Sequence, residues 1–248
     1  MPKLAANLSL LFVDQPFLER FAAARRAGFR YVEYQFPYAA GSAAEVAAAA
    51  RDAGVDVVLH NIPAGDAAKG DRGLAGLPSR RAEFREGVER AIEYARAAGC
   101  PRMNCLAGVP PADLPRAKAL DELVENIAFA AGRLASAGMD LMVEPINPRS
   151  VPGFLLNSSA DALAAIDASG ARNAYLQYDL FHMQIVEGDL AKTVERLLPR
   201  IGHMQLADVP DRHEPGTGEI NFAWLLPEID RLGYSGWIGC EYNPLKGT

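Results

Sequence analysis

The sequence predicts an α/β fold, a single (β/α)8 TIM barrel over residues 1–248 whose last helix is short or missing. Eight short apolar segments typical of strands alternate with alanine-rich segments of helical periodicity. Parallel strands joined by helical crossovers close into a barrel when there are eight, and a chain of 248 residues has the usual size for this fold. We therefore expect one catalytic domain.

Each expected strand is a short apolar or β-branched run, and each expected helix carries apolar residues three or four positions apart. The strands cover residues 4–8, 31–34, 56–60, 102–106, 140–144, 174–179, 202–206 and 237–242. The helices cover residues 16–27, 43–53, 80–98, 117–137, 159–168, 190–198 and 222–232. Glycines typical of helix ends follow at Gly28, Gly54, Gly99, Gly138, Gly170 and Gly233. The chain ends too soon for an eighth helix, so we expect an open or thinly covered barrel on that side.

Two long loops each follow an expected strand. Residues 61–79 are rich in glycine and too polar for the core, which is typical of a functional loop or lid. Residues 209–221 form the second loop. Loops that follow barrel strands lie on the C-terminal face of the barrel, where enzymes of this fold hold their active sites.

The bulk properties exclude several classes of function. The net charge of -6 provides no basic surface for phosphates, so we expect no nucleic-acid partner. No apolar run is long enough to span a membrane, and the N-terminus lacks the pattern of a signal peptide, so we expect a cytoplasmic protein. The three cysteines, Cys100, Cys105 and Cys240, lack the spacing of a zinc site and predict no disulfide framework.

Four consecutive strands end in residues that can ligate a metal: Glu144, Asp179, Gln205 and Glu241. If these side chains face the barrel interior, three carboxylates converge and raise one another's pKa unless a cation lies among them. Oxygen ligands favour a hard divalent ion such as Mg²⁺ or Mn²⁺ over zinc. A salt bridge or a helix cap would explain any one of these residues alone, but it explains four in series poorly.

Several stretches along the chain resemble the hydroxypyruvate isomerase family of the xylose-isomerase-like barrel superfamily. They are "ANLSLLF", "GFRYVEYQFPY", "HNIPAGD", "EPIN", "QYDLFHMQ", "IGHMQLAD", "EPGTGEINF" and "GWIGCEY". The resemblance implies metal ligation by Glu144, Asp179, Gln205 and Glu241, with Glu144 and Glu241 as the catalytic acid and base. In related epimerases the strand-seven ligand is a histidine, and here the matching residue is Gln205.

Histidines and loop cations provide the candidate substrate contacts. The resemblance implies that His182, three residues after Asp179, contacts substrate, whereas His60 is either a substrate contact or a structural histidine. His203 is expected to be an interior histidine with its own partner, or to replace Gln205 as a ligand. An acidic substrate needs a cation near its carboxylate, and the loops offer Lys69, Arg72 and Arg212, each of which is otherwise a surface residue.

The expected reaction is the interconversion of hydroxypyruvate and tartronate semialdehyde through an enediol, with a small hydroxy-keto acid as substrate and no nicotinamide. A 2-oxo-tetronate isomerase and a ketose 3-epimerase are alternatives with the same chemistry. A metal-dependent endonuclease would need more histidine ligands and a basic groove, and a non-enzymatic binding barrel would not need the glutamate pair. The sequence leaves open whether the chain forms a homo-oligomer.

Overall fold

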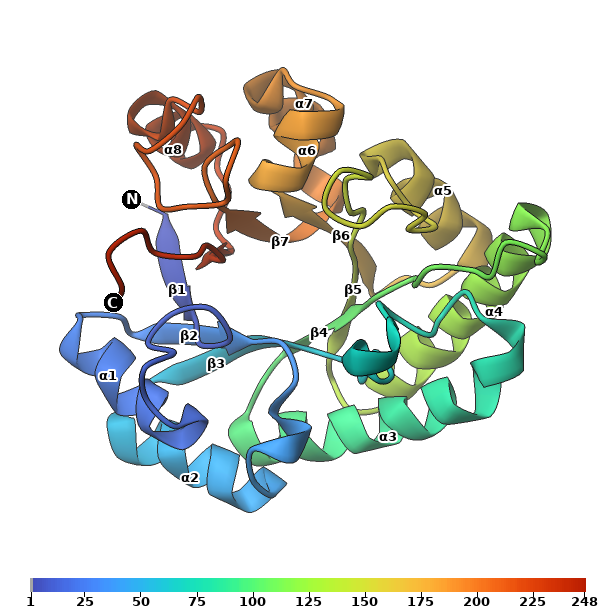
Figure 1. Cartoon of the computed structure of the whole chain (residues 1–248), viewed down its shortest axis with the longest axis horizontal. Coiled ribbons are helices and arrows are strands. Elements are labelled where there is room, and N and C mark those ends of the chain that lie inside the picture. Colours follow the sequence, from blue (N-terminus) through green and yellow to red (C-terminus); the bar gives the residue numbers. More distant parts are fainter. Residues whose placement is uncertain (1) are drawn as a thin grey trace.

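The computed structural model describes residues 2–248 and forms a closed barrel of eight parallel strands in chain order (Figure 1). The strands are β1 (Lys3–Asn7), β2 (Tyr31–Tyr34), β3 (Asp56–Asn61), β4 (Arg102–Cys105), β5 (Asp140–Val143), β6 (Ala174–Asp179), β7 (Ile201–Leu206) and β8 (Trp237–Cys240). The predicted fold class is therefore confirmed. β8 pairs directly with β1, so the barrel is closed on the side where we expected an open or thinly covered end. Within residues 2–248 no helix follows β8.

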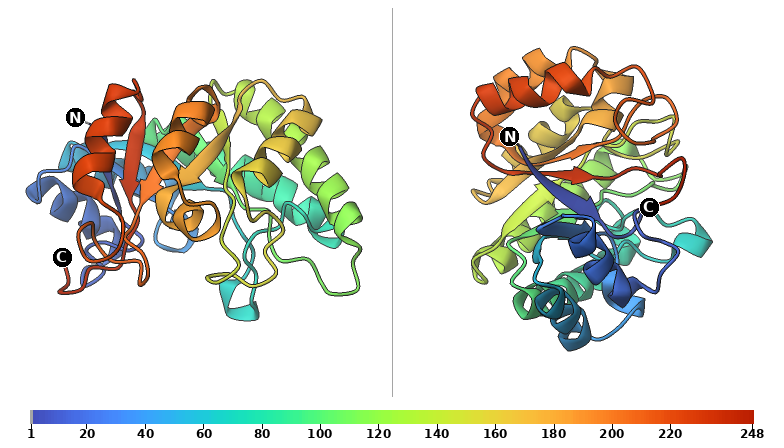
Figure 2. Two further views of the ribbon diagram at one scale, coloured as in Figure 1. Left: turned by 90° about the horizontal axis from the view of Figure 1, so that it is seen from above. Right: turned by 90° about the vertical axis from the view of Figure 1, so that its left-hand side faces the viewer.

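The helices form an outer ring around the strands, as the three views of Figures 1 and 2 show. They are α1 (Arg20–Arg26), α2 (Ala43–Ala53), α3 (Arg81–Ala98), α4 (Arg116–Ala135), α5 (Ser159–Ser169), α6 (Leu180–Val186), α7 (Leu190–Leu197) and α8 (Phe222–Arg231). Short 3-10 turns are η1 (Phe17–Glu19), η2 (Pro37–Ala39), η3 (Ala67–Lys69), η4 (Pro78–Arg80) and η5 (Leu198–Arg200). Helix α6 was not predicted, because it has only seven residues and follows β6 without a loop.

Local chemistry fixes where the helices begin and end. At the start of α2, Ser42 and Glu45 form a reciprocal capping box, in which each side chain accepts a hydrogen bond from the backbone of the other. The same helix ends at Gly54, whose φ of 67° lies in the left-handed region that glycine adopts without strain. Such caps satisfy the backbone groups that a helix leaves without partners.

One ion pair joins two helices of the outer ring. Glu122 of α4 is buried, with 3% of its surface exposed, and its carboxylate accepts hydrogen bonds from Arg81 of α3 and from Asn126. Arg81 lowers the pKa of Glu122, so the pair stabilises the packing of α3 on α4. Among residues 2–248, no helix has both the length and the apolar character needed to cross a membrane.

The loop of residues 61–79 is tied to the strand ends. Gly73 pairs with Ala107, and the backbone N–H of Gly76 donates to the carbonyl of Ala107 at 2.8 Å. A Cβ atom at Gly73 would lie 2.4 Å from the carbonyl oxygen of Leu106, so this close approach requires glycine. Arg80 holds Asp71, in the same loop, with an N–O distance of 3.2 Å. These contacts fix the loop beside the barrel mouth.

Candidate active site

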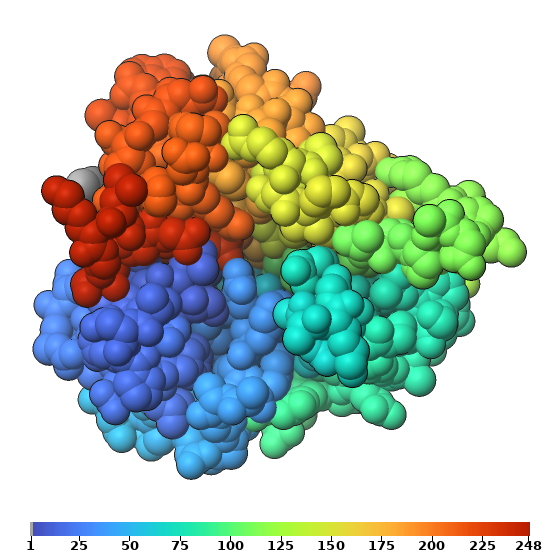
Figure 3. All heavy atoms as spheres, in the orientation of Figure 1, coloured from blue at the N-terminus to red at the C-terminus, as the bar shows by residue number. Residues whose placement is uncertain are grey.

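A cavity of about 490 Å³ lies where the carboxyl ends of the strands meet the loops. Five of the predicted site residues line it: Arg72, Glu144, His182, Arg212 and Glu241. Phe36, Ile146 and Val151 contribute apolar wall. Figure 3 shows the loops after β3 (cyan) and β5 (yellow-green) on the face of the molecule toward which the cavity opens. The size of the cavity and its mixture of polar and apolar lining residues are typical of a small-molecule site.

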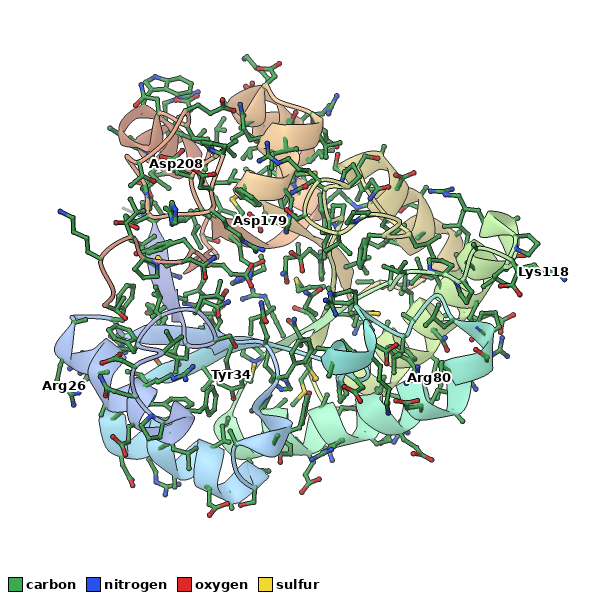
Figure 4. All side chains as sticks on the ribbon, in the orientation of Figure 1. Arg26, Tyr34, Arg80, Lys118, Asp179 and Asp208 are labelled. Carbon is green, nitrogen blue, oxygen red and sulfur yellow. The ribbon has the colours of Figure 1, made fainter. Side chains whose placement is uncertain are left out.

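Glu144, Asp179 and His182 form a cluster in which one ligand atom from each residue lies within 4.8 Å of the others. Glu144 follows β5, Asp179 ends β6, and His182 lies one turn into α6. His182 Nε2 lies 3.5 Å from Asp179 Oδ2 and 3.9 Å from Glu144 Oε1. In Figure 4 Asp179 is labelled near the centre of the barrel, whereas Arg80 lies farther out. The cluster therefore brings three groups that can bind a metal to the mouth of the barrel.

The hydrogen bonds of Asn147 determine which nitrogen of His182 carries the proton. Asn147 Oδ1 accepts from the backbone N–H of Ser150 at 2.8 Å, so the amide nitrogen of Asn147 faces His182 Nδ1 at 2.6 Å. Burial lowers the pKa of His182 well below its usual value, so the ring is neutral with its proton on Nε2. In this tautomer Nε2 donates toward the carboxylates. The oxygens of Glu144 and Asp179 therefore fit a hard metal ion, and His182 in this tautomer does not.

Arg212 connects two of the buried carboxylates. Its Nη2 lies 2.9 Å from Glu241 Oε2 and 3.4 Å from Asp179 Oδ2. Glu241 also accepts hydrogen bonds from Gln35 Nε2 at 2.8 Å and from Asn7 Nδ2 at 3.2 Å. Positive charge thus already faces two carboxylates without a metal. Gln35 and Asn7 were not predicted, because a side-chain amide on a strand or in a loop is common without any role in a site.

Gln205 lies beside the cluster with partners of its own. Its Nε2 donates to Glu33 at 2.8 Å, and its Oε1 accepts from Gln177 Nε2 at 2.6 Å. Of the four predicted metal ligands, the structure brings Glu144 and Asp179 into the 4.8 Å cluster. Glu241 lies outside that cluster and pairs with Arg212, and the amide of Gln205 is engaged by Glu33 and Gln177.

Burial separates the protonation behaviour of the two glutamates. Desolvation, together with the charges of Glu241 and Asp179, raises the pKa of Glu144 well above its usual value. Desolvation also raises the pKa of Glu241, to about 7, and Arg212 opposes that rise. Burial therefore favours the protonated form of Glu144, whereas part of Glu241 is ionised near neutral pH. One carboxyl group can give a proton where the other can take one.

The remaining predicted substrate contacts lie in different surroundings. His60 is fully buried, stacks on Tyr34, and has a pKa lowered to about 4 by desolvation, as in a structural histidine. Lys69 is 80% exposed and pairs with Asp66 at 3.2 Å. Arg72 lines the cavity, and its Nη1 donates to the backbone carbonyls of Ala67 and Asp71. Of the three loop cations, Arg72 and Arg212 thus line the cavity.

The loop that carries Arg212 is organised around one buried carboxylate. Asp208 Oδ1 accepts from the backbone N–H groups of Val209 and Ile220, and Oδ2 accepts from those of Gly216, Thr217 and Gly218, all at 2.9–3.1 Å. The backbone N–H of Arg212 in turn donates to the Asp208 carbonyl, with Arg212 at a φ of 62°. Asp208 is 1% exposed and was not predicted as important. An aspartate two residues after a strand and before a glycine-rich loop is the signal that could have identified it.

The chain is similar to known proteins over its whole length. Residues 21–248 match the family model described as xylose isomerase-like TIM barrel. The chain belongs to this family. A 2-oxo-tetronate isomerase from Cupriavidus necator is 48% identical over the whole chain and 95% of its own length. A hydroxypyruvate isomerase from Escherichia coli K12 is 46% identical over the whole chain and 96% of its own length. The prediction of an isomerase of the xylose isomerase-like family is thus confirmed.

Solved structures of other proteins share this fold. A crystal structure from Brucella melitensis, described as an AP endonuclease of family 2, is 40% identical, with a TM-score of 0.95 and coverage of 99% of this chain and 94% of that one. The L-ribulose 3-epimerase structure is 23% identical, covers 100% of this chain and 83% of its own, and has a TM-score of 0.80, a likeness that concerns the fold alone.

We expect Asp208→Asn to lower kcat/KM of the isomerase by at least about tenfold, since each hydrogen bond to a charged group contributes about 1.5–3 kcal/mol. An amide cannot accept at both ends, so the loop loses part of its anchorage and Arg212 is no longer held beside Glu241. The measurement is kcat/KM for Asp208→Asn, Arg212→Ala and the double variant. Because Asp208 acts through Arg212, the double variant should be no less active than Arg212→Ala. Losses that multiply would contradict this dependence.

Proposed function

We propose that this protein interconverts hydroxypyruvate and tartronate semialdehyde by moving a proton between adjacent carbons. The observation that carries the proposal is a pair of buried glutamates, Glu144 and Glu241, in one cavity with pKa values held apart. A relative 46% identical over the whole chain is a hydroxypyruvate isomerase. The partly buried arginine of the same cavity, Arg212, suits a substrate that carries a carboxylate.

The proposed mechanism uses the two glutamates in succession. Ionised Glu241 removes a proton from the hydroxymethyl carbon, and the electron pair of the C–H bond forms the enediolate double bond while the keto oxygen gains negative charge. Protonated Glu144 then delivers its proton to the former keto carbon. The hydroxyl proton of the substrate passes to the other oxygen, so the product is the aldehyde with no change in overall oxidation state. Each positioned carboxylate contributes roughly 10²–10⁴ in rate.

Positive charge near the reacting oxygens stabilises the enediolate. Arg212 is 2.9 Å from Glu241 and lines the cavity, so its guanidinium is in place for this role or for binding the substrate carboxylate. The Nε2–H of His182 points into the same space as a neutral donor. A divalent metal, Mg²⁺ or Mn²⁺, held by Glu144 and Asp179 would add further charge at these oxygens.

A four-carbon 2-oxo-tetronate is a second candidate substrate. The cavity of about 490 Å³ is larger than a three-carbon acid requires, and the relative from Cupriavidus necator, 48% identical, is a 2-oxo-tetronate isomerase. Both substrates share the reacting 2-keto-3-hydroxy unit, so the same glutamates serve either one. We expect the distinction to depend on how residues that line the cavity, such as Phe36 and Arg72, contact the fourth carbon.

The proposed function is tested by proton exchange in D₂O with hydroxypyruvate, 2-oxo-tetronates and simple ketoses. We expect exchange at the carbons of the 2-keto-3-hydroxy acids and none with ketoses. Glu241→Gln should reduce exchange by at least about 10²-fold with little change in thermal stability, since an amide cannot take the proton. Near-normal exchange in that variant, or exchange of ketoses alone, would exclude the proposal.

The pH profile reports the protonation states of the two glutamates. Glu241 must be ionised to act as base, so kcat/KM should rise with pH through its pKa of about 7. It should fall at higher pH, where Glu144 loses the proton that it must donate. Arg212 lowers the pKa of Glu241, so Arg212→Gln should move the acidic limb to higher pH. An acidic limb that stays in place or moves to lower pH would show that Glu241 is not the titrating base.

The metal ligands are tested by Mn²⁺ binding to the EDTA-treated protein, measured by electron paramagnetic resonance. We expect Asp179→Asn to weaken binding by about tenfold or more, the loss of about 1.4 kcal/mol that removal of one charged ligand readily exceeds. Gln205→Met should leave the affinity unchanged, because the amide of Gln205 is engaged by Glu33 and Gln177. Equal weakening in both variants would instead support a four-residue ligand set that includes Gln205.

A further inference from the structure

Below the barrel mouth, Glu33 of β2 presents a fully buried carboxylate to three neighbouring side chains. Its Oε1 accepts from Asn7 Nδ2 at 2.9 Å and from Gln205 Nε2 at 2.8 Å, and its Oε2 lies 2.6 Å from His203 Nε2. Neither Glu33 nor His203 has any exposed surface. A Cβ atom at Gly239 would lie 2.2 Å from Glu33 Oε1, so the missing side chain on β8 makes room for this carboxylate. The barrel interior is therefore shaped around Glu33.

The first connection runs from Glu33 through Asn7 to Glu241. Asn7 Nδ2 has two hydrogens, and it donates to Glu33 Oε1 at 2.9 Å and to Glu241 Oε1 at 3.2 Å. Its Oδ1 accepts from the backbone N–H of Ser9 at 3.0 Å. An ionised carboxylate only accepts, so Glu33 requires Asn7 to present its amide nitrogen on this side. The same orientation supplies Glu241 with a donor.

The second connection runs from Glu33 through Gln205 and Gln177 to Glu144. Because Gln205 turns its amide nitrogen to Glu33, its Oε1 faces Gln177 and accepts from Gln177 Nε2 at 2.6 Å. Gln177 Nε2 also donates to Glu144 Oε2 at 3.0 Å. Each amide in this chain has its direction set by the one before it. The orientation of the amide that donates to Glu144 thus depends on Glu33, with Gln205 and Gln177 lying between the two carboxyl groups.

We propose that Glu33, paired with His203, is a positioning residue that sets the direction of both amide chains and so holds Glu144 and Glu241 in their reactive orientations. This inference rests on the proposed function of the two glutamates. Without the acceptor at Glu33, the amide nitrogen of Asn7 loses one of its two partners, and nothing holds the amide nitrogen of Gln205 away from Gln177. Glu33 itself has no exposed surface and does not line the cavity.

The test substitutes Glu33→Met, which keeps the length of the side chain and removes both acceptor oxygens. We expect kcat for proton exchange in D₂O to fall by about 10²-fold, the low end of what a positioned carboxylate contributes. KM should change by less than about threefold, because no contact with the substrate is lost. Glu33→Gln keeps one oxygen for Asn7 and Gln205, so it should retain kcat within about tenfold of the wild type.

Glu122→Met is the matched control. It removes another buried glutamate, one in the helical ring, whose carboxylate holds Arg81 and Asn126 and does not line the cavity. It should lower the melting temperature by several degrees, at about 2–4 °C for each kcal/mol lost, and leave kcat unchanged. A purely structural role for Glu33 would give the same pattern in Glu33→Met and would overturn the inference, as would a change confined to KM.

If Glu33→Met does not fold, a double-mutant cycle between Glu33→Gln and Gln177→Met decides the question. The two sites belong to one chain of hydrogen bonds, so their effects on kcat should be less than multiplicative; fully multiplicative effects would overturn the inference. Absence of exchange in the wild-type protein would instead remove the proposed function, and this inference with it. Exchange in the wild type together with unimpaired Glu33→Met would remove the inference alone.

Discussion

The arrangement of side chains at the mouth of this barrel is governed by the free-energy cost of burying several negative charges close together. Glu144, Asp179 and Glu241 are each no more than 5% exposed, and charged groups withdrawn from water in this way are destabilising unless they are paired or protonated. The structure uses both remedies. Arg212 pairs with Asp179 and Glu241, while the raised pKa of Glu144 favours its uncharged, protonated form. The division of acid and base between the two glutamates is a consequence of this compensation.

A second requirement follows from the first, because a buried carboxylate needs donors with a fixed direction. Side-chain amides supply them here: Asn104 and Gln177 donate to Glu144, and Asn7 and Gln35 donate to Glu241. A side-chain amide can turn either its oxygen or its nitrogen toward a neighbour, so its orientation has to be fixed by another contact. In the barrel interior the carboxylate of Glu33 accepts hydrogen bonds from the amide nitrogens of Asn7 and Gln205. The hydrogen bonds that reach Glu144 and Glu241 continue from these two amides.

The sequence was sufficient to predict the parts of the molecule that depend on periodicity. All eight strands lie where apolar runs were found, and Glu144, Asp179, Gln205 and Glu241 stand at consecutive strand ends, as alternation required. What could not be predicted depends on which atoms meet across the barrel. The pairing of Glu33 with His203, more than 160 positions apart, follows from strand register and from the absence of a side chain at Gly239. The tautomer of His182 likewise depends on a loop amide that no pattern indicates.

The loop that carries Arg212 is held in shape by hydrogen bonds to one carboxylate, that of Asp208. Five backbone N–H groups of the loop converge on this one carboxylate, which lies two residues after the end of β7. Evolution can therefore lengthen, shorten or exchange the segment between Asp208 and α8 while the strands and their glutamates stay unchanged. The position of a cationic side chain on such a loop can change to suit a different acid while Glu144 and Glu241 stay in place. This is one route by which proteins with the same barrel come to act on different substrates.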